Sequence, residues 1–342
     1  MNLLHRFAAA IASLCVASGV SAQYLSPAGG ADYMDPGHPF TIFDNMRINN
    51  VLNHLDLGLN IGSNGVGLEL AAPVTDWARV RAGVDVMPHI NIPMHFNVVT
   101  YADGQVGNNF DRVQEIMTQL TNYDMDEVID MKAKPTGVNF RFMVDVMPIP
   151  SNRNWHLTVG FLVGSNKMGT VANTPEEMPS LLMMNLYNYY YDFLAEKRYL
   201  DEPLLPGITD VDLSPDEYEK IFEKMEPYGH LGMHVGDFKD GTPYIMEPGK
   251  DGMVKASAFV NRFKPYVGIG YNGAPARDKR FKIGFDLGVL FWGGAPQVIT
   301  HDGTNLTRDV RHISGKVGDY MGLIRGLKVC PSLSFKMSYT LF

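Results

Sequence analysis

Eight segments of this 342-residue chain alternate large apolar side chains with polar side chains or glycine, which is the period of a β-strand. In segment 281–292, every second residue up to Phe291 is large and apolar. Most segments have about ten residues, the length of a strand that crosses a membrane. The eight segments are 55–62, 65–72, 78–87, 137–147, 155–164, 264–271, 281–292 and 327–342.

A membrane-spanning helix is not expected in the mature chain. After residue 22, no apolar run reaches the roughly 18 uninterrupted residues that such a helix needs. The closest run, 181–194, is interrupted by Asn185, Asn188 and Asp192.

The connections between the segments fall into two classes. Short turns follow the second, fourth and sixth segments, whereas long connections follow the third, fifth and seventh. An even number of strands with short turns at one end and long loops at the other is typical of bacterial outer-membrane barrels. We therefore expect an all-β fold, a closed antiparallel transmembrane β-barrel of eight strands whose long extracellular loops contain short helices. A soluble exported β-sandwich is the structural alternative.

The second and third segments predict a hairpin with a defined register. Pairing about residue 75 sets Leu70 opposite Val80 on the apolar face. The same register sets Glu69 opposite Arg81 on the polar face, as a cross-strand ion pair.

The polar faces of the eight segments carry equal numbers of acidic and basic residues. An eight-stranded barrel has room inside only for side chains, so charges in its lumen must pair with one another. Glycine, of which the chain has 34, fills many other positions on these faces, which favours a lumen over a solvated sandwich face. We therefore expect a lumen ion-pair network of Asp56, Glu69, Asp85, Asp145, Asp286, Arg79, Arg81, Arg141, Lys282 and Lys336.

All three tryptophans fall at the ends of predicted strands. Trp77 and Trp155 stand beside short turns, and Trp292 stands at the outward end of the seventh segment. Tryptophan is enriched at membrane interfaces, so this placement predicts an aromatic belt, with core packing as the alternative.

The first residues have the pattern of a secretory leader. A short basic start with Arg6, an apolar stretch and a small-residue cleavage site predict a signal peptide over 1–22. We expect a periplasmic extension over 23–50 and the barrel over 51–342. Without the leader the net charge is −9, because the leader carries Arg6 and no acid, and this disfavours nucleic acid as a partner. Cys330 then stands alone, so no intramolecular disulfide is expected.

The insert 165–258 has 17 acidic and 8 basic residues, so it accounts for the whole negative excess. We expect it to be extracellular, with a helix over 179–199 and a second helix that begins at the capping residue Ser214. The insert is interpreted either as a lid over the barrel or as a recognition surface for an unknown extracellular partner. The exposed side chains of that surface would be Tyr187, Tyr189, Tyr190 and Tyr191.

The chain resembles the OmpA-type transmembrane barrel domain of small bacterial outer-membrane proteins. The resemblance covers residues 51–342 and rests on the turn at 72–83, on segment 264–271 and on the terminal Phe342. It implies insertion into the outer membrane of a Gram-negative bacterium, contact with outer-membrane lipid, and Phe342 as an assembly signal for the barrel-insertion machinery. The usual companion aromatic residue two positions earlier is replaced by Thr340.

The sequence contains no complete motif for catalysis or for binding a cofactor. Residues 268–273 match GxGxxG, but a strand follows instead of the helix that a dinucleotide needs. His230 and His234 would lie about 13 Å apart on a strand, too far to chelate one metal ion. We therefore expect no enzyme, cofactor or metal, and a structural, envelope-integrity or surface-interaction role. The alternatives are a narrow channel for small solutes and an outer-membrane lipid-modifying enzyme.

Overall fold

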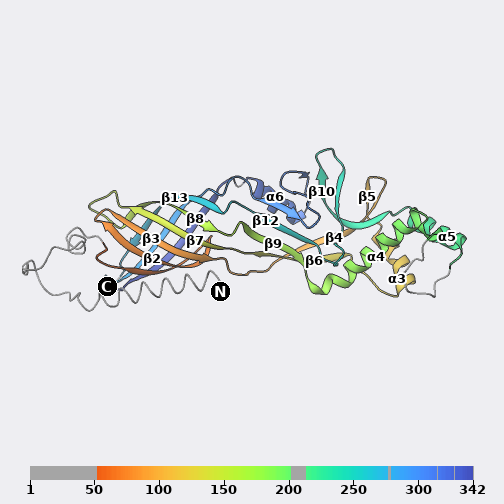
Figure 1. Cartoon of the computed structure of the whole chain (residues 1–342), viewed down its shortest axis with the longest axis horizontal. Helices are drawn as coiled ribbons and strands as arrows, with labels where there is room; N and C mark the ends of the chain where they lie inside the picture. Colours follow the sequence, from red (N-terminus) through yellow and green to blue (C-terminus); the bar gives the residue numbers. More distant parts are fainter. Residues whose placement is uncertain (1–51, 202–212, 276–278, 314, 327, 342) are drawn as a thin grey trace, which may run out of the picture.

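The computed structural model describes residues 52–201, 213–275, 279–313, 315–326 and 328–341. The molecule is elongated, with a barrel at one end, a sheet in the middle and helices at the far end (Figure 1). The predicted signal peptide, the predicted periplasmic extension and Phe342 lie outside the described residues.

Eight strands close into an antiparallel barrel in the order β1-β17-β14-β13-β8-β7-β3-β2. Each strand pairs with the barrel strand that follows it in the chain, and β17 pairs with β1 to complete the ring. The predicted eight-stranded closed barrel is therefore confirmed, and the β-sandwich alternative is wrong. The strands are β1 (Asp56–Gly62), β2 (Gly65–Thr75), β3 (Ala78–Val86), β7 (Val138–Val146), β8 (Trp155–Gly164), β13 (Phe263–Gly273), β14 (Phe281–Leu290) and β17 (Cys330–Thr340).

The predicted register of the β2–β3 hairpin is wrong by two residues. Leu70 faces Ala82, and Glu69 faces Gly83. The difference arises because Thr75 pairs with Ala78 across a two-residue turn, with an irregularity in the pairing between Pro73 and Thr75. Since the displacement is an even number of residues, each side chain keeps its predicted face.

The outer surface of the barrel is apolar on every strand. Phe335 is 62% exposed and Leu68 is 59% exposed, and side chains of the same kind alternate along the other strands. A contiguous exposed apolar surface of this extent suits lipid and not water. The exposed members include Leu57, Val138, Val159, Ile269, Leu287, Leu333 and Met337.

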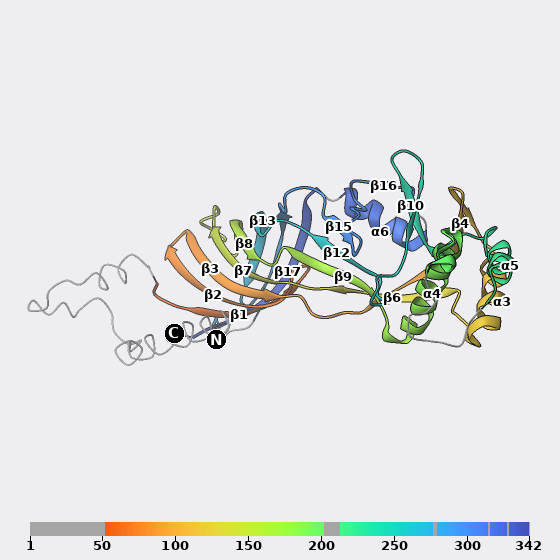
Figure 2. The same ribbon diagram turned by 45° about the vertical axis from the view of Figure 1, so that its right-hand side comes forward.

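Beyond the barrel, a second sheet continues five of the barrel strands. Its order is β11-β10-β4-β6-β9-β12-β15, with β5 and β16 paired to its members. Strands β4, β6, β9, β12 and β15 are each joined by two to six residues to β3, β7, β8, β13 and β14, in the same order around the barrel (Figure 2). The bounds are β4 (Ile92–Ala102), β5 (Gln105–Gly107), β6 (Val128–Pro135), β9 (Lys167–Asn173), β10 (His230–Phe238), β11 (Pro243–Met246), β12 (Lys255–Phe259), β15 (Gln297–Thr300) and β16 (Val310–Arg311).

The remaining three barrel strands end at the rim. β1 and β2 are joined by the short turn Ser63-Asn64, and β17 is preceded by helix α6 (Gly315–Gly326). The barrel wall is therefore prolonged on one side only, as an open half-cylinder of five strands.

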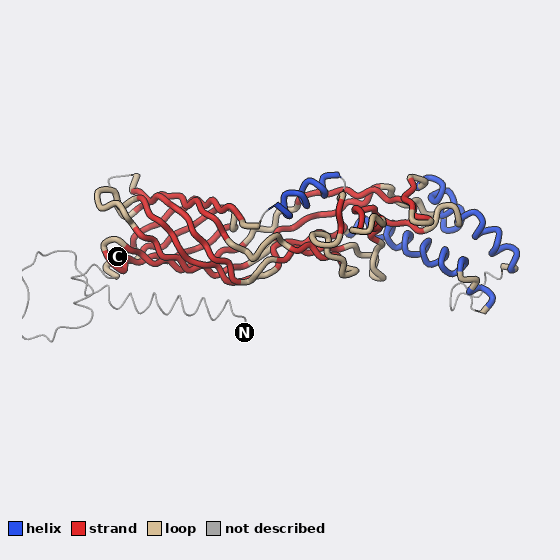
Figure 3. The backbone as a smooth tube through the Cα atoms, turned by 90° about the horizontal axis from the view of Figure 1, so that it is seen from above, coloured by secondary structure: helices blue, strands red, loops and turns tan. Residues whose placement is uncertain are grey.

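Helices α3 (Phe110–Thr121), α4 (Met178–Ala195) and α5 (Pro215–Met225) gather at the end of the molecule away from the barrel (Figures 1 and 3). Short 3-10 helices, η1 (Pro175–Glu177) and η2 (Arg198–Leu200), flank α4. Among the residues that the structure describes, no helix is both long and apolar enough to cross a membrane.

The helices of the insert do not form a lid over the barrel, as one interpretation of the sequence held. α4 and α5 pack on the far part of the sheet, where Leu181, Phe193 and Met225 are buried in one apolar core with Met117 and Met233. The five-strand extension separates α4 and α5 from the barrel, so these helices lie too far along the molecule to cover the lumen (Figure 3).

Candidate functional site

The structure brings all ten predicted lumen charges together inside the barrel. Arg81 is at the centre of the group, because its guanidinium bonds carboxylates from three other strands. The nitrogen–oxygen distances are 2.8 Å to Asp145, 2.8 Å to Asp286 and 3.3 Å to Glu69. Arg81 and its three carboxylate partners are almost fully buried.

A second arginine extends the network toward the outer end of the barrel. Arg141 lies 3.0 Å from Glu69 and 3.4 Å from Asp85. Asn60 connects the same groups, since its amide nitrogen donates to Asp85 over 2.8 Å and its oxygen accepts from Arg141 over 2.8 Å.

The remaining predicted charges pair nearer the turn end. Lys336 lies 3.1 Å from Asp286, and Arg79 pairs with Asp145. Lys282 lies 2.7 Å from Asp56. Each of the five acids and five bases therefore has a partner of opposite charge, which a buried charge requires.

The predicted lumen network omits several polar residues that the structure places in the lumen, one of them charged. His156 bonds Asp286 over 2.9 Å, and Thr158 donates to Asp145 over 2.8 Å. Lys264 donates to Asn139 over 2.8 Å near the outer mouth. The alternation within β8 and β13 places all three of these donors on the lumen side, so the same pattern could have found them.

An apolar layer lies in the lumen beside the charges, on the neighbouring strands β7, β8, β13 and β14. It consists of Met143, Leu162, Tyr266 and Leu290, each at most 5% exposed. The Tyr266 hydroxyl lies where a Cβ on Gly268 or Gly288 would come within 2.5 Å, so the two glycines make room for the ring. In the described residues, charged and polar side chains together with this layer occupy the barrel interior.

Two of the three tryptophans lie at the outer surface of the barrel. Trp77 is 57% exposed, and Trp155 packs on Tyr271 with ring centroids 5.3 Å apart. Trp292 does not belong to a lipid-facing belt, because it is only 7% exposed. It follows the outward-facing Phe291, so alternation turns it to the buried side. At that end of the barrel, Phe161 and Phe263 pack together at the surface, with ring centroids 5.4 Å apart.

One of the four tyrosines of the expected recognition surface is not exposed. Tyr187 is fully buried, because the helical period places it on the core face of α4 with Leu181 and Met184. Burial also raises the pKa of Tyr187 above its ordinary value. Tyr189, Tyr190 and Tyr191 remain at least partly exposed.

Tyr189 belongs to an aromatic group at the helical end of the molecule. Its ring stacks on Phe193 with centroids 6.2 Å apart, and the Arg198 guanidinium lies 5.3 Å from its centroid. This cation–π contact fixes the position of an aromatic ring that faces solvent.

The structure places both of the motifs considered above, residues 268–273 and the His230–His234 pair, on strands. Residues 268–273 lie within β13, and the next element is strand β14. His230 and His234 both belong to β10. Across the described ranges, no group of three or more histidine, cysteine or acidic residues is arranged to hold a metal ion.

His230 instead connects α4 to the outer sheet through two carboxylates. Its Nδ1 lies 3.0 Å from Glu247 and its Nε2 lies 2.8 Å from Asp192 of α4. The Tyr191 ring packs edge-on against the imidazole, with centroids 5.1 Å apart. The hydrogen bond to Glu247, followed by that to Asp192, raises the pKa of His230 against the opposing effect of burial.

This cluster predicts that α4 docks more firmly at low pH. A raised pKa in the folded state contributes stability that is full below the ordinary value of about 6.5 and is lost as pH rises through the folded value. Amide hydrogen exchange in α4, corrected for the intrinsic rate, is therefore expected to be slower at pH 6 than at pH 8.5. His230→Gln should abolish the difference, whereas His312→Gln, at an exposed histidine, should keep it. An unchanged pH dependence in His230→Gln would contradict the assignment.

Comparison with protein-family models and with curated proteins gives no match. Among solved structures, the chain is similar to CarO2 and CarO of Acinetobacter baumannii, at 12% and 10% identity and a TM-score of 0.34 for both. It is also similar to a major outer membrane protein of Thermus thermophilus, at 11% identity and a TM-score of 0.26. Each comparison covers 84% of this chain and 97% or 98% of the other. The fold assignment rests on the strand pairing described above.

Proposed function

We propose that this protein is an outer-membrane barrel that anchors a sheet-and-helix part and displays it at the surface of a Gram-negative bacterium. Its role is structural, in envelope integrity or in surface interaction, and is not enzymatic. The observation that carries the proposal is the direct continuation of five adjacent barrel strands into the outer sheet. Because five strands connect them, the outer sheet is held rigidly at the end of the barrel.

The distribution of loops supports the orientation. The turn at Asp76-Trp77 and the connection 147–154 leave the barrel at one end, and the whole outer part leaves it at the other. In bacterial outer-membrane barrels, short turns are periplasmic and long connections are extracellular, as the resemblance to OmpA-type barrels also implies. The net negative charge of the insert 165–258 suits a solvated surface.

The filled lumen argues against the narrow channel. Solute passage would require the buried pairs around Arg81 and Arg141 to separate and the Tyr266 layer to move. No observation favours a lipid-modifying enzyme, since His156 and the lumen acids are bonded to one another. The partners that we propose are outer-membrane lipid, the barrel-insertion machinery through Phe342, and an extracellular molecule at the helical end.

Epitope tags test the orientation. We expect a tag inserted at Gly241, in the turn between β10 and β11, to bind antibody on intact cells. A tag inserted at Asn152, in the connection between β7 and β8, should bind antibody only after the outer membrane is permeabilised. Both positions are exposed turns outside the strands, so insertion should leave the barrel intact.

The folded state of each tagged chain is checked by its mobility in SDS before and after boiling. The reverse pattern of accessibility, with Asn152 reached on intact cells and Gly241 hidden, would overturn the orientation. Inaccessibility of both tags in a properly folded protein would overturn display at the surface.

A further inference from the structure

The convex face of the five-strand extension continues the lipid-facing surface of the barrel. On that surface Val163 pairs with Phe263, and both side chains are exposed. Four residues farther from the barrel, Lys167 pairs with Phe259 in the same register, and backbone hydrogen bonds connect the two pairs across the junction. Because four is an even number, Lys167 and Phe259 lie on the same side as the lipid-facing pair.

Two further lysines lie on this convex face. Lys132 and Lys134 are exposed residues of β6, which runs into β7 through residues 136–137 alone. Val138 of β7 faces lipid, and both lysines precede it by an even number of residues, so all three side chains share one side of the strand.

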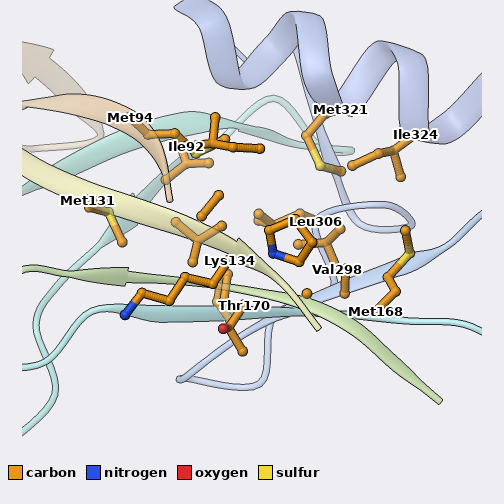
Figure 4. A pocket seen from close by; sticks show the side chains of 18 of the residues that line it. Ile92, Met94, Met131, Lys134, Met168, Thr170, Val298, Leu306, Met321 and Ile324 are labelled. Carbon is orange, nitrogen blue, oxygen red and sulfur yellow. The ribbon is translucent and has the colours of Figure 1, made fainter. Parts of the chain in front are cut away.

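The opposite, concave face of the extension is apolar. Met131 and Ala133, which alternate with the two lysines along β6, line a cavity that Met321 of α6 borders from the other side. Figure 4 shows the amino group of Lys134 directed away from the apolar side chains of this cavity. The lysines therefore belong to the face that looks outward, away from the core.

The positive charge on the convex face is not compensated by nearby carboxylates. In the described part of the chain, none of Lys132, Lys134 and Lys167 forms an ion pair. Strands β4, β6, β9, β12 and β15 together contain one acidic residue, Asp130, which lies 2.6 Å from His95. All 17 acidic residues of the insert lie outside these five strands, between positions 176 and 251.

The height of the lysines matches the headgroup region of a membrane. Lys134 and Lys167 each lie four residues beyond an exposed apolar residue at the outer end of a barrel strand, Val138 and Val163. Four residues span about 13 Å along a strand, and less along the membrane normal because barrel strands are tilted. The polar region on each side of the hydrocarbon core is roughly 5 to 8 Å thick, and a flexible lysine side chain reaches back toward it.

We propose that Lys132, Lys134 and Lys167 form a basic face that binds the anionic headgroups of membrane lipids. A lipid is favoured over a soluble polyanion or an acidic protein, because the basic face is continuous with the lipid-facing surface and lies at headgroup height. This contact holds one side of the extension against the membrane. The inference rests on the proposed membrane anchoring and names the lipid chemistry that the extension selects.

The lipid that co-purifies with the full chain tests this selection. After equilibration in micelles with equal amounts of phosphatidylglycerol and phosphatidylcholine, the wild type is expected to retain about three times more of the anionic lipid. One basic residue at a membrane surface gives up to about a fivefold preference. The combined variant Lys132→Gln, Lys134→Gln and Lys167→Gln should bring the ratio close to one. Salt at about 1 M should lower the wild-type ratio in the same direction.

A second triple variant controls for the loss of net charge. Lys220→Gln, Lys224→Gln and Lys250→Gln remove three exposed lysines that lie outside the five strands of the extension, and this variant should keep the wild-type ratio. Both variants are compared only after heat-dependent mobility in SDS has shown that the barrel is folded.

Three outcomes would overturn the basic face. They are equal retention of the two lipids by the wild type, an unchanged ratio in the variant of the basic face, and an equal loss of phosphatidylglycerol in both variants. The lipid ratio is measured on purified, folded protein, whereas the tags report orientation on cells. A failure of the basic face is thus distinguishable from a failure of surface display.

Discussion

Arg81→Met is expected to destabilise the barrel by about 3 to 5 kcal/mol, the cost of removing one member of a buried group of ion pairs. The guanidinium of Arg81 lies within 3.3 Å of Glu69, Asp145 and Asp286, all on the lumen side. Methionine has a similar length but no charge, so three carboxylates lose their shared cation. The measurement is the temperature at which the folded band disappears in SDS gels, and this temperature should fall clearly below that of the wild type.

Two further variants separate charge from packing. Arg153→Met removes an exposed arginine, 3.9 Å from Asp76, and should shift the transition little because exposed ion pairs contribute about 0 to 1 kcal/mol. Glu69→Gln added to Arg81→Met removes one of the three carboxylates that lose Arg81 and should recover part of the lost stability, because Arg141 keeps Asp85 as a partner. Charge compensation in the lumen would not be what stabilises the barrel under either of two outcomes. One is that Arg81→Met has the same SDS transition temperature as the wild type, and the other is that adding Glu69→Gln to Arg81→Met lowers this temperature further.

The barrel could be predicted because its determinants are local. Alternation along ten residues assigns a side chain to lipid or lumen, and a short turn assigns the neighbouring strand. The choice of partners inside the lumen is not local. Arg81 and Asp286 are 205 positions apart, and they meet only because β3 and β14 approach across a closed ring. The sequence therefore predicts which charges enter the lumen, but the pairing follows from closure.

The sequence predicts loops where the outer sheet lies, because several strands of this sheet are very short and the long strand β4 lacks a clean alternation. In β4, three consecutive residues, Val98, Val99 and Thr100, are buried, since the sheet there is covered on both faces. β4 also contains Pro93, and β6 ends at Pro135, and proline normally argues against a strand. The order of these strands is set by the barrel strands that precede or follow them, so the sheet could not be derived before the ring was known.

The burial of Tyr187 likewise could not be predicted from the sequence, because it depends on how one helix packs on the sheet. The sequence favours a helix near 179–199, and α4 spans Met178–Ala195. Which tyrosine is buried depends on the face that meets the sheet, and α4 is apolar around much of its circumference, so its sequence does not define that face. Asn188 settles the orientation in the structure, because its side chain bonds both the amide nitrogen and the carbonyl oxygen of Leu231 in β10, at 2.8 Å each.

Phe193→Ala is expected to destabilise the outer part by about 3 to 5 kcal/mol while leaving the barrel unchanged. Phe193 is fully buried, stacks on Tyr189 and packs edge-on against Tyr218 of α5, so alanine leaves a cavity between α4 and α5. Limited proteolysis in detergent should cut α4 and α5 at much lower protease concentrations than in the wild type. The barrel strands, which share no core residue with Phe193, should keep the same SDS transition temperature.

Leu182→Ala is the matched control, since Leu182 belongs to the same helix but is 46% exposed. It should leave both the protease resistance and the SDS transition near those of the wild type, because little apolar area is removed from a buried environment. A barrel transition that falls together with the outer part in Phe193→Ala would mean that the five continuous strands transmit unfolding into the membrane. The stability of the barrel would then depend on the outer part that it displays, and the two parts would unfold as one unit.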